Sequence, residues 1–116
     1  QTQYFSQQTE LIKEIHSLLT EHLDHRFTIE DLSKRYLLNT STIKEVFKGV
    51  YGLPIARYMK EFRIRKAMEL LRDTNDSIAI ISRQVGYESQ SKFTKAFKDI
   101  TQTLPSEYRK KYRISH

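Results

Sequence analysis

The stretch SIAIISRQVGYESQSKFTKAFKDITQTLPSEYR, residues 77–109, decides the fold. Its apolar residues recur at spacings of three and four, the period of amphipathic helices: Ile78, Ile81, Val85, Phe93, Ala96, Phe97 and Ile100. Gly86 separates two such runs, and Ser77 and Ser89 stand where helix N-caps are expected. The stretch therefore predicts a short helix, a tight turn and a second helix, followed by a last short helix from Pro105.

A similar pattern occurs about 50 residues earlier in the chain. Leu32-Ser33-Lys34 corresponds to Ile81-Ser82-Arg83, and Phe47-Lys48 corresponds to Phe97-Lys98, with a one-residue difference in the turn. Each copy has the helix-turn-helix layout, in which the second helix enters the major groove of DNA. The alternative is a helical repeat that stacks for stability alone. Such solenoids need three or more copies, and this chain has two.

The same periodicity predicts the rest of the chain. A first helix covers about residues 8–23, Thr28 opens a short helix, and Asn39 opens a helix that ends at Gly52. From Pro54 a longer helix runs to about Arg72, and at about 1.5 Å per residue it is nearly 30 Å long.

We therefore expect an all-α fold of seven helices that forms a single domain over residues 1–116. It comprises two helix-turn-helix subdomains, about 8–53 and 77–113, joined by a linker helix at about 54–73. This is a homeodomain-like tandem arrangement.

Charge is unevenly distributed along the chain, whose net charge is +6. Residues 1–31 carry two basic and six acidic side chains, whereas the remaining 85 residues carry 18 basic and eight acidic ones. A compact basic region indicates an anionic partner such as nucleic acid or an anionic membrane.

Composition also narrows the class of protein. The chain has no cysteine, which excludes disulfides, Cys-ligated zinc and iron–sulfur clusters and fits a reducing cytosol. No apolar run is long enough to span a membrane and no signal peptide precedes the fold, so we expect a cytoplasmic protein without a membrane partner. Because the chain starts at Gln1, we expect that it was cut from a longer protein.

The outward positions of the two second helices are rich in hydroxyls, amides and lysines, which bind base edges and phosphates. They are Thr40, Ser41, Thr42, Lys44, Glu45, Lys48, Gln90, Ser91, Lys92, Thr94, Lys95 and Lys98. No acidic residue stands between Gln90 and Lys98, although an ordinary solvated helix usually mixes both signs. As a set these positions favour DNA binding.

The whole pattern resembles the C-terminal domain of AraC/XylS-type transcription regulators over roughly residues 10–112. The matching landmarks of the second copy are Ile81, Val85-Gly86-Tyr87, Ser91, Phe93, Phe97-Lys98 and Pro105 through Arg109. Those of the first copy and the helix that follows it are Leu32, Ile43, Phe47, Lys48, Gly52, Arg63, Ala67 and Leu70-Leu71.

The resemblance implies that both recognition helices enter adjacent major grooves on one face of double-stranded promoter DNA. Position by position, it assigns base readout to Ser41, Lys44, Glu45, Gln90, Ser91, Lys92 and Lys95. It assigns phosphate contacts to Thr40, Lys48, Lys98 and Arg109. Family members usually act as activators that contact RNA polymerase, and they usually carry a separate effector-binding or dimerisation domain, which we expect to be absent from this sequence.

Several positions depart from the family pattern. Ser33 and Ser82 replace alanine without a large change in volume, Gln102 replaces a glycine, and Leu104 replaces a polar residue that caps the last helix. Glu45 accepts from a cytosine amino group but repels phosphates. We therefore expect the first unit to discriminate more between sequences and the second to supply more affinity.

Nothing in the sequence indicates an enzyme, a cofactor or a metal site. His16, His22 and His25 are interpreted as scattered surface histidines, and His116 is the last residue. The basic tail, residues 109–113, is a phosphate anchor, a membrane-surface patch or a solubilising segment. The rival function is that of a helical protein-interaction module that docks on polymerase without reading DNA.

Overall fold

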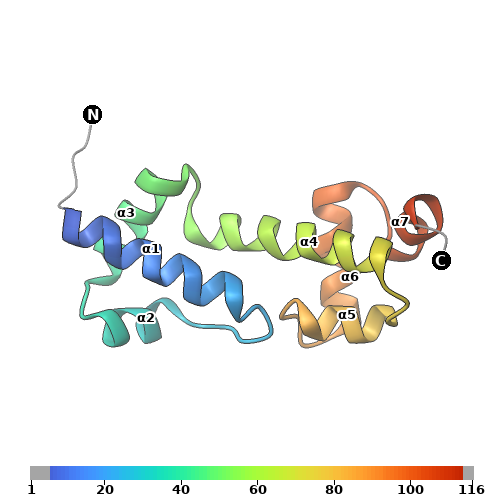
Figure 1. Ribbon diagram of the computed structural model, residues 1–116, viewed down its shortest axis with the longest axis horizontal. Helices are drawn as coiled ribbons and strands as arrows, with labels where there is room; N and C mark the ends of the chain where they lie inside the picture. The colour runs from blue at the N-terminus through green and yellow to red at the C-terminus, as the bar shows by residue number, and fades with distance from the viewer. Residues whose placement is uncertain (1–5, 114–116) are drawn as a thin grey trace. The chain divides into compact units, whose positions relative to one another are not determined.

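The computed structural model describes residues 6–113, and this part of the chain consists of seven α-helices without strands (Figure 1). The predicted all-α fold is therefore confirmed. The helices are α1 (Ser6–Glu21), α2 (Ile29–Tyr36), α3 (Thr40–Tyr51), α4 (Ile55–Asp73), α5 (Ile78–Gln84), α6 (Gln90–Thr101) and α7 (Pro105–Tyr112). The chain forms two compact units, of which unit 1 ends at Met59 and unit 2 begins at Lys60.

Unit 1 contains α1, α2, α3 and the first turn of α4 around an apolar core. Its buried residues are Ile12, Ile15, Leu19, Leu23, Leu32, Ile43, Val46, Phe47 and Met59. Helix α1 ends at Glu21, two residues before the predicted end, but Leu23 in the following turn is still buried. Thr28 caps α2 as predicted: its hydroxyl accepts from the Asp31 amide at 3.0 Å, and the Asp31 carboxylate accepts from the Thr28 amide at 3.1 Å.

Unit 2 contains the rest of α4 with α5, α6 and α7. Its buried cluster consists of Ile64, Ala67, Leu71, Ile81, Val85, Phe93, Ala96 and Phe97. The prediction that Ile100 points inward is wrong, because this side chain is 37% exposed. The last residue of α6 in the buried cluster is Phe97, one turn before Ile100.

The two helix-turn-helix turns have matching backbones but different residues at the tightest point. The Leu38 amide donates to the Ser33 carbonyl at 3.2 Å in unit 1, and the Tyr87 amide donates to the Ser82 carbonyl at 2.9 Å in unit 2. Gly86 turns the chain in unit 2 with φ at +91°, whereas Leu37 does so in unit 1 with φ at +54°. A leucine in the left-handed region is strained, and the Leu37 side chain, 89% exposed, gains no packing in return.

His16 is not the surface histidine that the sequence predicts. Its ring stacks on Tyr51 at 4.3 Å between centroids, and its Nε2 lies 2.8 Å from the Tyr58 hydroxyl. Tyr51 ends α3 and Tyr58 lies in the first turns of α4, so this histidine on α1 joins three helices of unit 1. Burial lowers the pKa of His16 because it disfavours the charged imidazolium.

Replacing the strained leucine should stabilise the protein. We expect Leu37→Gly to raise the free energy of unfolding by about 0.5–1 kcal/mol, since about 1–2 kcal/mol of left-handed strain outweighs the extra backbone entropy of glycine. Gly52→Ala is the control, because Gly52 has φ at +85° and a Cβ there would meet nothing within 4 Å. This variant should lose about 1 kcal/mol through backbone strain alone. Urea unfolding measures both, and a destabilised Leu37→Gly variant would contradict the assignment of strain.

The histidine contact should make stability depend on pH. The folded protein holds the pKa of His16 below its ordinary value of about 6.5, so the unfolded chain takes up this proton first as the pH falls. The contribution of His16 to the free energy of unfolding is therefore complete above a pH of about 6.5 and decreases as the pH falls below it towards the folded-state pKa. We expect His16→Phe, which keeps an aromatic ring, to flatten the decrease between neutral and mildly acidic pH, as measured by urea unfolding. His22→Gln, at an exposed histidine, is the control; an equal effect there would exclude His16 as the cause.

Candidate nucleic-acid interface

Each unit holds one 12-residue helix, α3 or α6, in the position of a recognition helix. The inner faces are fixed by phenylalanines, since Phe47 on α3 and Phe93 and Phe97 on α6 are all 0% exposed. Phe47 makes an edge-on contact with Tyr58 at 5.4 Å, and Phe97 makes an edge-on contact with Tyr108 at 5.6 Å. The same aromatic pair thus secures both helices to the helix that follows.

The N-termini of the two helices are capped differently. The Ser89 hydroxyl accepts from the Lys92 amide at 3.1 Å, as predicted for the start of α6. Asn39 occupies the N-cap position of α3 with extended backbone angles, but its side chain makes no capping hydrogen bond. The first turn of α3 is therefore held mainly by its buried face.

The predicted site residues of α3 share one helix and are mostly exposed. Ser41, Lys44, Glu45 and Lys48 are exposed, and Thr40 at the first position is half-buried. The face carries two lysines, one carboxylate and two hydroxyls. These groups can donate to phosphates and can both donate to and accept from base edges.

The predicted site residues of α6 are all exposed and more basic. They are Gln90, Ser91, Lys92, Lys95 and Lys98. The ammonium group of Lys92 pairs with the carboxylate of Glu88, which lies just before the helix. The acid-free character of this face therefore ends at its N-terminal edge, where Glu88 adds an acceptor that sequence reasoning missed. The four-residue spacing between an acidic and a basic residue is the signal that reveals such a pair.

Arg109 has a structural role that sequence reasoning missed. Its Nε donates to the Leu71 carbonyl at 3.0 Å, and its Nη2 donates to the Thr74 carbonyl at 3.2 Å. Leu71 lies in the last turn of α4 and Thr74 follows directly after the helix, where a cation is favoured by the helix dipole. Burial lowers the pKa of Arg109. At least two of its five N–H groups therefore serve the fold.

Arg63 is a second arginine that donates to a backbone carbonyl, and it is buried. It is 3% exposed, and its Nη1 donates to the Val85 carbonyl at 2.8 Å. Val85 lies at the end of α5, directly before the glycine of the turn. Arg63 on α4 therefore fixes the helix-turn-helix turn of unit 2, which sets the start of α6.

Other kinds of site are not evident in the part of the chain that the structure describes. Residues 6–113 contain no group of three or more His, Asp or Glu side chains placed to hold a metal ion. Within the same range, no helix combines the length and apolar character needed to cross a membrane. His116 lies outside the described residues.

The chain is similar to known regulators over most of its length. A sequence profile described as "Helix-turn-helix domain" matches residues 32–111. The HTH-type transcriptional activator RhaR of Mannheimia succiniciproducens is 28% identical over 101 residues, which cover 87% of this chain and 37% of RhaR. The arabinose operon regulatory protein of Escherichia coli is 30% identical over 99 residues, which cover 84% of this chain and 34% of that protein. This chain thus spans about a third of the length of these relatives.

A solved structure shows the same fold. The DNA-binding domain of AdpA, a global transcriptional factor described in complex with a target DNA, superposes with a TM-score of 0.82 at 23% identity. The superposition covers 87% of this chain and 91% of the AdpA chain. The profile match, the relatives and the paired helix-turn-helix units together show that this chain belongs to the AraC/XylS family of helix-turn-helix transcription regulators.

Proposed function

We propose that this chain binds double-stranded promoter DNA in a sequence-specific way, with α3 and α6 each inserted into a major groove. One observation carries the proposal: each unit fixes the inner face of a helix by buried phenylalanines and exposes a polar, lysine-bearing outer face. That arrangement suits a recognition helix, which reads base edges in the major groove of DNA. The similar AdpA domain, described with its target DNA, supports it.

The residues divide into two roles in this proposal. Ser41, Lys44 and Glu45 on α3 and Gln90, Ser91, Lys92 and Lys95 on α6 read base edges. Thr40, Lys48 and Lys98 contact phosphates. Arg109 stays a candidate for a phosphate contact only through the N–H groups that do not donate to the Leu71 and Thr74 carbonyls.

The wider biological role extends the same proposal. The chain acts as a transcription regulator without a catalytic step, as an activator that contacts RNA polymerase. It works as one part of a larger protein whose effector-binding or dimerisation domain lies in another segment. The site of action is the bacterial nucleoid in the cytoplasm, because promoter DNA is there. The names of RhaR and the arabinose regulator support this role, but each is about three times as long as the matched region.

A salt titration tests DNA binding. We expect the chain to bind a duplex selected from random DNA, with an affinity that falls steeply between about 50 and 200 mM salt. A plot of the logarithm of the binding constant against the logarithm of the salt concentration should fall with a slope of about 0.9 for each neutralised phosphate. Fluorescence anisotropy gives the affinity, and a scrambled duplex of equal length is the control. Equal affinity for both duplexes would remove sequence specificity. Salt-independent binding, or none, would favour the rival module that docks on a protein.

A pair of basic residues tests the division between structural and DNA-contacting side chains. Lys98→Ala should weaken all DNA sequences about equally and reduce the salt slope by about one phosphate, with the free energy of unfolding unchanged. Arg109→Ala should lower the free energy of unfolding by about 1–3 kcal/mol, because two carbonyls at the end of α4 lose their donor. Urea unfolding and the salt titration are both measured for each variant. An Arg109→Ala variant with wild-type stability and a reduced salt slope would make Arg109 a phosphate contact instead.

A further inference from the structure

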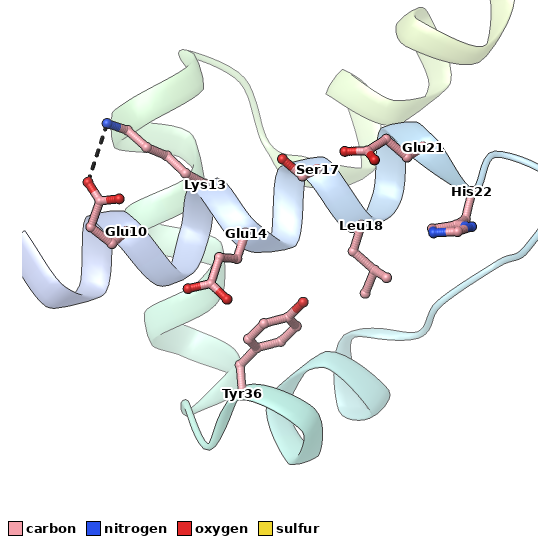
Figure 2. Close-up of a pocket in the computed structure, with 8 residues that line it drawn as sticks. All are labelled: Glu10, Lys13, Glu14, Ser17, Leu18, Glu21, His22 and Tyr36. Atoms are coloured by element: carbon pink, nitrogen blue, oxygen red, sulfur yellow. Dashed lines mark ion pairs between the residues drawn. The ribbon is translucent and has the colours of Figure 1, made fainter.

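A groove lies in unit 1 between α1 and α2, with a volume of about 410 Å³ (Figure 2). Leu18 on α1 and Tyr36 on α2 project into the space between the two helices. The lining also includes three glutamates of α1: Glu14 reaches into the space towards Tyr36, and Glu10 and Glu21 lie further along the helix on either side of it. The groove therefore combines an apolar centre with an acidic border.

The charge of this groove is opposite to that of the recognition helices. Lys13 is the basic residue on its α1 border, and its ammonium group lies 3.6 Å from the Glu10 carboxylate. Glu14 and Glu21 remain as exposed carboxylates beside the apolar centre. Such a border repels DNA phosphates and attracts a basic peptide segment. A segment that also carries one apolar or aromatic side chain would fill the centre.

The end of α7 in unit 2 has this composition. Its last turn carries Lys110 and Lys111, and Arg113 follows directly. All three side chains are exposed. Between them lies Tyr112, a large aromatic that is 47% exposed, with the Lys111 ammonium group 5.4 Å from its ring centroid. The positive charge and the aromatic side chain of this segment complement the acidic and partly apolar groove of unit 1.

We propose that the groove between α1 and α2 of one copy binds the basic end of α7 of a second copy. Such a head-to-tail contact joins two different surfaces of the chain, so it can repeat from one copy to the next. Two DNA sites in the same orientation on one duplex bring two copies close together for this contact. This step rests on the proposed DNA binding.

The contact between two free copies is expected to be weak. Exposed ion pairs contribute little to the binding free energy, and the net charge of +6 makes free copies repel one another. Neighbouring sites on one duplex raise the effective concentration of one copy at the surface of the other. The contact therefore appears as cooperative occupation of two direct repeats and as a small population of dimers in concentrated solution.

Cooperativity on DNA gives the first test. Binding to a duplex with two selected sites in direct repeat should be about five- to tenfold cooperative, the range that a few exposed pairs can supply. Glu14→Lys and Lys111→Glu should each abolish it, and the two changes combined should restore it. Asp24→Lys, the same charge change at an exposed residue outside the groove, should leave it intact. Independent binding by the wild type, or a double variant that stays independent, would overturn the contact.

Single-site affinity separates this contact from DNA binding itself. Glu14→Lys and Lys111→Glu should change the affinity for one isolated site by less than about threefold, a small effect on the scale of a direct phosphate contact. A larger loss with Lys111→Glu would show that the end of α7 binds DNA and would overturn the proposal. If the wild type binds no single site, the proposed function fails, and the following readout still decides the contact.

The absence of cysteine in the chain permits a test without DNA. Ser17→Cys places a thiol in the groove, and Arg113→Cys places one beside the basic end of α7. Mixed in low salt and oxidised, these two variants should form a disulfide-linked heterodimer at least about fivefold faster than Asp24→Cys mixed with Arg113→Cys, in line with the expected cooperativity. Equal rates in both mixtures would overturn the proposal, whatever the DNA experiments show.

Discussion

A single aromatic contact, repeated once in each unit, underlies the positions of both recognition helices. The edge-on pairs Phe47–Tyr58 and Phe97–Tyr108 occupy equivalent places 50 residues apart, with interplanar angles of 78° and 73°. Each pair joins the C-terminal half of a recognition helix to the next helix along the chain. A helix can present its polar face in a defined orientation only when its opposite face is packed firmly. A buried aromatic ring provides this packing through its large buried area and its preferred edge-on geometry. The turns, caps and the buried Arg63 act together with this contact on the same helices.

Around the shared pair, the two units use different chemistry. Unit 1 adds His16, which stacks on Tyr51 and meets the Tyr58 hydroxyl, so its recognition helix is held by a cluster of aromatic rings. Unit 2 has Thr101 at the place of Tyr51; its ring contacts continue from Phe97 to Phe93 and Tyr87, and guanidinium groups also donate to backbone carbonyls. Since arginines stay charged at ordinary pH and burial lowers the pKa of His16, the pH dependence caused by His16 belongs to unit 1.

The fold follows from local information, whereas much of the site does not. Helix periods and caps such as Thr28 and Ser89 depend on residues within one turn, so the sequence predicts them well. The contacts of Arg109 reach carbonyls 35 and 38 residues away, and no local pattern indicates them. The contact of His16 escapes prediction for the same reason, because Tyr58 lies 42 residues further on. The turn at Leu37 was hidden because leucine gives none of the signals that glycine gives at Gly86.

The carboxylates on the two recognition faces sharpen the expected difference between the units. Glu45 is exposed in the middle of α3, within the face proposed to contact DNA. Glu88 lies at the edge of α6 and is paired with Lys92, so its charge is already balanced when DNA arrives. Releasing an exposed pair of this kind costs about 0–1 kcal/mol, less than the roughly 1–3 kcal/mol that a good base contact contributes. The pair is therefore no obstacle to the base readout proposed for Lys92. Glu45 lies in the middle of the proposed contact face and Glu88 at the edge of the other, and for that reason we expect discrimination to depend more on Glu45 than on Glu88.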